Sequence, residues 1–273
     1  MSPSPEPRRP SSAEPPAAAE VDASRSGAAS DTEGLIFTVS RLLAGVAHVA
    51  VGASSPIPGA GALLARALAE ENGSAPVRLS ILGSRRHNAF TNGGVEIFDM
   101  IAQGRIGAFF LGGGQIDAQA NINLVGAGNY PTMDVRWPGS FGSAYLYHLV
   151  PRVILFREEH SRRVLVPKVD FVSAPGPRDD GVYRPGGPYA LLTRRCLFSF
   201  DRERRRFRLD SVHPGHSVDE IRDETGFEFD CAPDVPTTEV PEGRALALIR
   251  GRVRNEIAET YPRFADQLAG ARS

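Results

Sequence analysis

The chain has 273 residues, of which 41% are hydrophobic and 23% are charged, and its formal net charge is -1. This length allows one large domain or two small ones with a substantial core, and the balanced charge excludes the basic footprint of a nucleic-acid-binding protein. Its two cysteines, Cys196 and Cys231, lie far apart and form no zinc-type motif with histidine, so we expect neither a disulfide framework nor a metal site.

Residues 1–33 are rich in proline, serine, alanine and charge, and they contain no aromatic side chain. Such a segment buries too little apolar surface to offset the entropy of ordering, so we expect a disordered N-terminal tail. The folded domain is predicted over residues 34–273, with a helical C-terminal segment from Glu242 to Leu268. Neither a signal-peptide core nor an apolar run long enough for a membrane span is found, which favours a cytoplasmic protein.

The first part of the domain alternates apolar runs with helical patterns. Short buried runs predict strands, and runs with apolar residues on one face predict helices. The expected helices are Thr38–Ala44, Gly59–Glu71 and Val95–Gln103; the expected strands are His48–Gly52, Val77–Leu82 and Ala108–Leu111. This alternation predicts an α/β fold with an open, mostly parallel sheet.

The second part is richer in strands than in helices. Further strands are expected at Ile122–Val125, Val153–Phe156 and Val164–Val166. Leu191–Phe200 and Phe207–Ser211 flank a charged turn, which predicts an antiparallel hairpin that extends the sheet. A helix over 217–225 begins with Ser217 and has Glu220 three residues later, which is a capping-box pattern.

A glycine-rich turn follows the strand Ala108–Leu111, in the run "FFLGGGQIDAQANINLVG". Gly112, Gly113 and Gly114 let the backbone approach a ligand and present N–H groups to an oxyanion or phosphate, and Gln115 adds a neutral amide. A purely structural turn explains the glycines equally well. The spacing is not that of a dinucleotide-binding fingerprint.

A second loop, "RWPGSFGSAYLYHL", contains the small residues Gly139, Ser140 and Gly142. Small side chains here favour close approach of the backbone to a ligand, or simply tight packing of a helix on the sheet. His148 is a possible acid or base, although a histidine on an apolar helical face is more often packed. The charged turn 158–160 is interpreted as solvated rather than as a metal site.

Four segments in order resemble the β subunits of family I coenzyme A transferases, especially the glutaconate CoA-transferase type. They are "RLLAGVAHVAVGASSPIPGAGALLARALA", "GRIGAFFLGGGQIDAQANIN", "RWPGSFGSAYLYHLVPRVILFREEHS" and "CLFSFDRERRRFRLDSVHPGHSVDEIRDETGFEF". The resemblance implies an open α/β sheet, an acyl-CoA substrate and a site shared with a homologous α subunit, commonly in an α2β2 complex. Coenzyme A would enter as part of the substrate, and no other cofactor is implied.

Transferases of this family carry a glutamate nucleophile just after the second major strand. A carboxylate suits that role because its anhydride with the acyl group is reactive enough to be passed on. In this chain the stretch reads "GSRRHN", so Ser84, Arg85 and Arg86 stand where the resemblance places the nucleophile. Glu71 precedes the strand and is interpreted as a helix end capped by Gly73, and Glu96 lies on the next helix.

Three functions remain open from the sequence. The resemblance extends to a branch of CoA-ester hydrolases in which a carboxylate of the α subunit acts, and there the loops around Gly112–Gln115 and Gly139–Gly142 would line the acyl-CoA pocket. Arg85 and Arg86 would then bind a carboxylate of the acyl group, or else contact solvent or the partner subunit. The alternatives are a CoA-transferase that uses Glu71 or Glu96, and a non-catalytic subunit that stabilises an active partner.

Overall fold

The computed structural model describes residues 27–177 and 181–270. Most of the predicted tail therefore lies outside the described residues. Helix α1, Asp31–Leu42, begins inside the segment expected to be a tail and before the predicted start at Thr38. The reason is a capping box, in which the Ser30 hydroxyl accepts from the Glu33 backbone N–H and the Glu33 carboxylate accepts from the Ser30 N–H.

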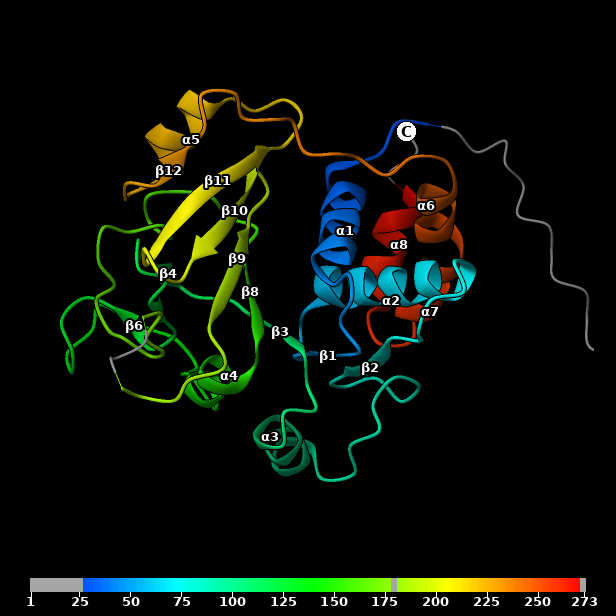
Figure 1. Cartoon of the computed structure of the whole chain (residues 1–273), viewed down its shortest axis with the longest axis horizontal. Coiled ribbons are helices and arrows are strands. Elements are labelled where there is room, and N and C mark those ends of the chain that lie inside the picture. Colours follow the sequence, from blue (N-terminus) through cyan, green and yellow to red (C-terminus); the bar gives the residue numbers. More distant parts are fainter. Residues whose placement is uncertain (1–26, 178–180, 271–273) are drawn as a thin grey trace, which may run out of the picture.

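One eight-stranded sheet runs through the molecule in the order β12-β11-β10-β9-β8-β3-β1-β2 (Figure 1). Strands β2, β1, β3, β8 and β9 are mutually parallel, and β10 and β11 continue the sheet in antiparallel fashion. This confirms the predicted mostly parallel sheet with an antiparallel extension. The strands are β1 His48–Val51, β2 Arg78–Ile81, β3 Ala108–Leu111, β8 Arg152–Phe156, β9 Pro188–Leu192, β10 Cys196–Asp201, β11 Arg206–Val212 and β12 Asp230–Cys231.

Two of the predicted strands need correction. Val164–Val166 forms no strand, because the backbone N–H groups of Val164 and Leu165 turn back to the Ser161 carbonyl, and Leu165 makes only an isolated bridge. The run Leu191–Phe200 is two strands, β9 and β10, separated by a turn at Thr193. The Thr193 hydroxyl accepts from the backbone N–H groups of the next turn residues, which reverses the chain.

Four short strands form two ribbons outside the sheet, next to the predicted glycine turn. They are β4 Gln115–Ile116 paired with β5 Ile122–Asn123, and β6 Gly126–Ala127 paired with β7 Val135–Arg136. The ribbons keep the loop after β3 compact and lead it towards helix α4.

Helices cover both faces of the sheet (Figure 1). On one face lie α1, α2 Pro56–Glu71 and the C-terminal α6 Gly243–Leu248, η1 Ile249–Val253, α7 Arg254–Ile257 and α8 Pro262–Gly270. The other face carries α3 Gly93–Ala102, α4 Ser143–Leu149 and α5 Val218–Glu224. Residues alternate between the two faces along each strand, so Val49 and Val51 contribute to one hydrophobic cluster and Ala50 to the other. Among the residues that the structure describes, none of the helices combines the length and the apolar character that a membrane span requires.

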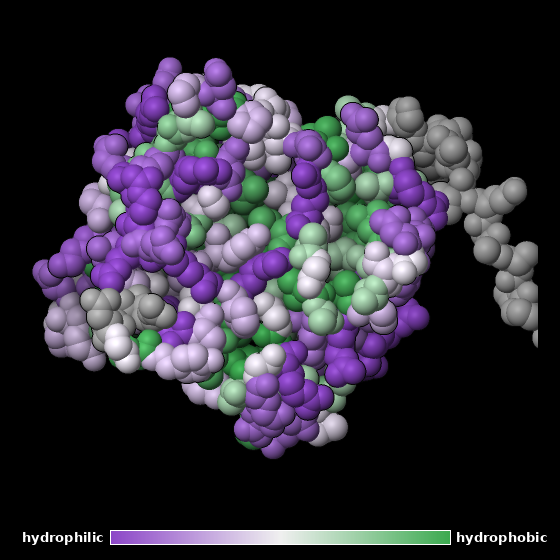
Figure 2. Space-filling model, in the orientation of Figure 1, coloured by the Kyte–Doolittle hydropathy of each residue, from purple (hydrophilic) through white to green (hydrophobic). Residues whose placement is uncertain are grey.

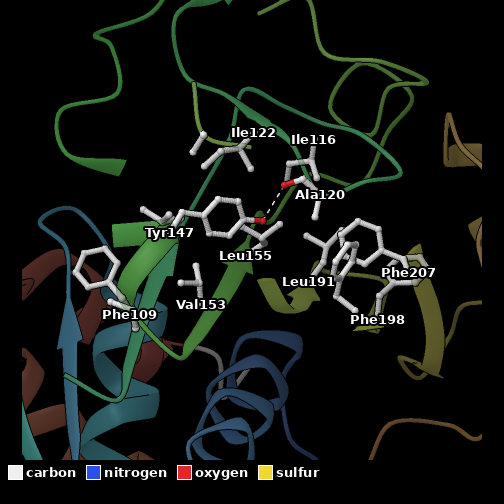
Figure 3. Close-up of a cluster of buried hydrophobic side chains, with 14 of the residues drawn as sticks. Phe109, Ile116, Ala120, Ile122, Tyr147, Val153, Leu155, Leu191, Phe198 and Phe207 are labelled. Carbon is white, nitrogen blue, oxygen red and sulfur yellow. Dashed lines mark hydrogen bonds between the residues drawn. The ribbon is translucent and has the colours of Figure 1, made fainter. Parts of the chain in front are cut away.

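The larger hydrophobic cluster lies under α3 and α4 and is drawn in Figure 3. Tyr147 of α4 is fully buried in it, and its hydroxyl donates a 2.7 Å hydrogen bond to the Ala120 carbonyl. Burial of the ring keeps α4 on the sheet, while the hydrogen bond satisfies the phenol and fixes the turn after β4. Helix α4 and the glycine-rich loop therefore occupy defined positions relative to each other.

Candidate functional site

The chain order of the central strands creates a crevice at one end of the sheet. From β1 the chain passes to β2 on one side, and it then returns to form β3 on the other side. The loops after β1 and β3 therefore diverge, which is where open α/β sheets bind ligands. Gly52 follows β1 and Gly112 follows β3, and both line a cavity of about 910 Å³ at these carboxyl ends.

The wall of this cavity is mainly apolar and aromatic. It takes Phe98 from α3, Phe109 from β3, Trp137 and Phe141 from the loop before α4, and Leu146 from α4. Figure 2 shows hydrophobic side chains at the surface near α3 and α4, whereas the face over β10 and β11 is largely hydrophilic. A cavity of this size and lining is typical of sites for organic ligands.

Gly112, Gly113 and Gly114 line the cavity. A Cβ on Gly113 would lie 2.8 Å from the Gln115 carbonyl oxygen, and a Cβ on Gly114 would overlap the ring of Trp137. The glycines therefore make room for the protein's own backbone and for an aromatic wall residue. This packing agrees with the structural use of the glycines that the sequence left open beside a binding loop.

In the loop before α4, too, some of the small residues line the cavity and one packs against the protein itself. Gly139 and Ser140 line the cavity, whereas Gly142 does not, because it lies against Phe98, whose ring a Cβ there would overlap. Gly142 thus allows α3 and α4 to pack closely. His148 is not among the lining residues and contacts the Ala144 carbonyl of its own helix at 3.1 Å.

Gln115 does not line the cavity. Its amide donates to Asp170 at 2.9 Å, and its oxygen accepts from Asn123 at 2.8 Å and from the Asp170 backbone N–H at 2.9 Å. With a side chain that is 7% exposed, Gln115 joins the loop after β3 to the segment around residue 170. Both the nitrogen and the oxygen of the Gln115 amide are therefore hydrogen-bonded within the protein.

Ser84, Arg85 and Arg86 follow β2 as predicted, but they lie outside the cavity lining, which takes Gly83 and Asn88 from this loop. The Ser84 hydroxyl donates to Glu259 at 2.8 Å and accepts from the Arg86 and His87 backbone N–H groups. Ser84 is buried and holds the turn together. The side chains of both arginines are exposed to solvent.

Glu259 was not expected from the sequence analysis. It lies between α7 and α8, and its carboxylate accepts from the Ser84 hydroxyl and from the Arg85 backbone N–H. The Arg85 N–H bond is the main reason why the pKa of Glu259 is lowered, so it is a carboxylate at neutral pH. The break between two C-terminal helices before Pro262 was the only local signal for a special role here.

The two glutamates considered as displaced nucleophiles lie elsewhere. Glu71 ends α2 and forms an ion pair with Arg244, with Nε and Oε2 2.9 Å apart. Glu96 accepts from the Thr91 backbone N–H at 2.6 Å and from the Thr91 hydroxyl. Among the described residues that line the large cavity, there is no aspartate or glutamate.

A smaller cavity of about 410 Å³ adjoins the first and shares Ser55, Gly112 and Arg157 with it. It adds Glu158 and Glu159 from the loop after β8. Burial raises the pKa of Glu159, but hydrogen bonds from Ser161 and Arg163 outweigh that effect and the pKa is lowered. Glu159 is therefore ionised, and its carboxylate near the site is already hydrogen-bonded to Ser161 and Arg163.

Three histidines, His160, His213 and His216, contact other side chains of the protein. His160 is 4% exposed and lies between the Thr193 and Thr225 hydroxyls at 2.9 and 3.0 Å, so it is buried rather than part of a solvated turn. His213 contacts Thr238 and His216 contacts Glu220. Within the described ranges 27–177 and 181–270, no group of three or more histidine, cysteine or acidic residues is arranged to hold a metal ion.

Comparison with known proteins now identifies the family. The model of the coenzyme A transferase family matches residues 48–224, which is more than half of the chain. The protein belongs to the coenzyme A transferase family. The match covers the whole crevice, from β1 to α5, and agrees with the resemblance seen in the sequence.

Individual relatives carry different activities. The chain is 32% identical over 162 residues to the B-type subunit of the 3-oxoadipate CoA-transferase of Pseudomonas knackmussii, covering 57% of this chain and 62% of that protein. It is 29% identical over 161 residues to the IpdB subunit of the cholesterol ring-cleaving hydrolase of Rhodococcus jostii, covering 57% and 62%. The matches thus span less than two thirds of these relatives' lengths.

Among solved structures, the decarboxylase AibA/AibB is similar over most of the fold. The TM-score is 0.68 at 25% identity, and the superposition covers 89% of this chain and 99% of that chain. Transferase, hydrolase and decarboxylase relatives therefore share this architecture, so the reaction has to be argued from the site itself.

Proposed function

We propose that this protein is the β-type subunit of a heteromeric enzyme that hydrolyses acyl-CoA esters and is active only with a homologous α-type subunit. The observation that carries the proposal is the crevice at the carboxyl ends of β1, β2 and β3, whose described lining contains no carboxylate. A transferase of this family needs such a group on the β chain as its nucleophile. Here Ser84 and the backbone of Arg85 bind Glu259 instead.

The proposed reaction adds water to the thioester carbonyl. The carbon–sulfur bond then breaks, the acyl group leaves as a carboxylic acid, and the thiolate takes up a proton to become free coenzyme A. A carboxylate of the α-type partner would take the proton from water. This chain would supply the apolar wall and the backbone around Gly112 and Gly113.

The competing function is CoA transfer through a carboxylate of this chain. Glu159 lines the adjoining cavity, and its carboxylate contacts Arg157 and Arg163 of the large one. However, Ser161 and Arg163 hold it at 2.7 and 2.6 Å, and an ionised carboxylate with these partners is a weaker nucleophile than a free one. We therefore favour hydrolysis.

The test is to co-express the chain with an α-type chain, purify the complex, and incubate it with acyl-CoA esters without any acceptor acid. Release of free coenzyme A, together with no adduct on this chain after borohydride treatment and mass analysis, supports hydrolysis. A reduced glutamyl-CoA thioester on this chain would show transfer instead, and peptide mapping with Glu71→Gln, Glu96→Gln and Glu159→Gln would locate it. An assembled complex whose turnover is unchanged in Gly114→Ala would indicate a non-catalytic subunit.

A further inference from the structure

The large cavity and the smaller one beside it meet at a junction whose residues line both. These shared residues are Ser55, Phe110, Leu111, Gly112 and Arg157. The reacting carbonyl of an acyl-CoA ester lies between the acyl group and the coenzyme. With one of these parts in each cavity, the thioester lies at the junction, whichever way round the ester is bound.

Arg157 is the charged residue at this junction, and its backbone position is fixed. It follows β8 directly, and β8 pairs with β3. The Arg157 backbone N–H donates to the Leu192 carbonyl at 3.1 Å. A Cβ on Gly112 would lie 3.3 Å from the Phe156 carbonyl oxygen, so the glycine loop passes close to the residue before Arg157. Arg157 therefore begins beside the glycine loop.

The positive charge of Arg157 has no carboxylate of its own. Its Nη2 lies 3.5 Å from Oε2 of Glu159, but the same carboxylate accepts from Arg163 at 2.6 Å and from the Ser161 hydroxyl at 2.7 Å. Charge-assisted hydrogen bonds of this type are typically about 2.7 to 2.9 Å long, so the Arg157 contact is weak. Two guanidinium groups share one carboxylate, and a net positive charge remains at the junction.

Most hydrogen-bond donors of Arg157 are uncommitted. Its Nε is buried without a partner, and its Nη1 donates to none of the described residues. Buried donors in folded proteins are nearly always paired, so this arrangement is unusual for an arginine that serves only the fold. The Arg157 side chain is 39% exposed and lines both cavities, which makes it accessible to a ligand.

We propose that Arg157 is a catalytic residue whose guanidinium stabilises the negative charge that develops on the thioester carbonyl oxygen. This inference rests on the proposed function, because it assigns a role in the same hydrolysis. A fixed cation beside that oxygen stabilises the oxyanion more than the neutral carbonyl of the ground state, and it thereby lowers the barrier.

The step balances without a further reactant. A carboxylate of the α-type partner takes one proton from water, the water oxygen bonds to the carbonyl carbon, and the π electron pair moves to the carbonyl oxygen. When that pair forms the carbonyl again, the carbon–sulfur bond breaks. The thiolate takes the proton from the partner carboxylate, which leaves a carboxylic acid and free coenzyme A.

A second role for Arg157 would be to bind a carboxylate at the far end of the acyl group. The two roles predict different kinetics. Loss of an oxyanion donor lowers kcat for every ester, whereas loss of a ligand for a distal carboxylate raises KM only for esters that carry one. We favour the first role because Arg157 lies at the junction of the cavities.

The experiment measures hydrolysis of butyryl-CoA and glutaryl-CoA by the complex of this chain with its α-type partner. The butyryl group is uncharged, and the glutaryl group ends in a carboxylate. We expect Arg157→Gln to lower kcat for both esters about 100-fold or more and to change KM less than about threefold. Arg157→Lys keeps the charge but not the planar fork, so it should retain more of kcat than Arg157→Gln.

Arg194→Gln is the matched control. The Arg194 side chain is 45% exposed and forms an ion pair with Glu158, but it lines neither of the two cavities. This substitution should leave kcat unchanged. Size-exclusion chromatography verifies assembly, and the unfolding midpoint of each variant complex should stay within about 2 °C of the wild type.

Failure of this inference and failure of the proposed function are distinguishable. An unchanged kcat in Arg157→Gln, or a loss seen only as a raised KM for glutaryl-CoA, would overturn the catalytic role. Loss of assembly in both Arg157 variants would assign the side chain to the fold and overturn it as well. All three results leave hydrolysis by the wild type in place. If the assembled wild-type complex releases no coenzyme A from any ester without an acceptor acid, the proposed function itself is wrong.

Discussion

The Ser84 hydroxyl donates a 2.8 Å hydrogen bond to the carboxylate of Glu259, a residue 175 positions later in the chain. The same carboxylate accepts from the Arg85 backbone N–H at 2.8 Å. The loop after β2, where family transferases carry their nucleophile, is thus tied to the C-terminal helices. Its serine is a structural anchor in this chain.

We expect Ser84→Ala to lower the free energy of unfolding by about 1 to 3 kcal/mol, because it removes a hydrogen bond to a charged group and leaves two backbone N–H groups of the turn without their acceptor. Urea denaturation measures the change. Ser74→Ala, on an exposed loop, is the matched control and should be neutral within about 0.5 kcal/mol. Unchanged stability combined with lost turnover would instead make Ser84 a catalytic residue.

Gly114→Ala should disturb the cavity wall, because the added Cβ overlaps the ring of Trp137. Overpacking of this kind costs about 1 to 3 kcal/mol. Trp137 is the single tryptophan of the chain, so a shift of its fluorescence emission reports the displacement directly. The double variant with Trp137→Leu should recover much of the lost stability. An unshifted emission spectrum would contradict the packing described here.

Two ion pairs to the C-terminal segment form a natural comparison. Glu33 is 1% exposed and its two oxygens bind Arg250 at 2.7 and 3.0 Å, whereas the pair of Glu71 with Arg244 is largely exposed. Glu33→Gln should cost about 3 kcal/mol, since it removes a buried negative charge that binds the mostly buried guanidinium of Arg250. Glu71→Gln should cost less than about 1 kcal/mol. If both variants lose the same free energy of unfolding in chemical denaturation, burial does not determine how much such an ion pair contributes.

The same pair predicts an acid-dependent loss of stability. Burial raises the pKa of Glu33, but the bonds from Arg250 and Ser30 outweigh it and the net pKa is lowered. Its stabilising contribution is therefore complete above the pKa of about 4 of an unfolded glutamate, and it is lost as the pH falls through the lower folded value. Denaturation of the wild type and Glu33→Gln should converge as the pH falls below about 4.

His160 should make the protein less stable between pH 7 and pH 5. Burial is the main cause that lowers its pKa to about 4, whereas an unfolded histidine titrates near 6.5. The unfolded chain then binds the extra proton, and folding loses about 2 kcal/mol by pH 5. His160→Gln, whose amide can bond to the same threonines, should remove this part of the pH dependence. An equally steep curve in the variant would assign the effect to other groups.

The sequence was most informative where short-range pattern decides the structure. The run Ala108–Leu111 is bounded by glycines and has no polar residue, and the strand β3 has those limits. The alternation from β1 to β8 likewise required the parallel sheet and the position of the glycine loops at one end. The start of α1 was missed although Ser30 and Glu33 carry its capping signal, because the surrounding composition suggested a tail.

The site depends on contacts that no local pattern encodes. Phe98 and Phe141 meet only because α3 and α4 pack together, and Glu259 reaches Ser84 only once the C-terminal helices dock. For the glycines at 114 and 142 the sequence left two uses open, room for a ligand or tight packing, and at each of them an added Cβ would overlap an aromatic ring of the protein itself. Arg85 and Arg86, which the sequence suggested as ligands of an acyl carboxylate, have side chains exposed to solvent.

The helical layer over β1 and β2 is assembled from opposite ends of the folded region. Helices α1 and α2 share one hydrophobic cluster with the C-terminal helices, and Glu33 contacts Arg250 across 217 positions. During synthesis the part of this cluster that residues 243–270 supply is missing until those residues have left the ribosome. The hydrogen bonds from the β2 loop to Glu259 therefore cannot form before nearly the whole chain has been synthesised.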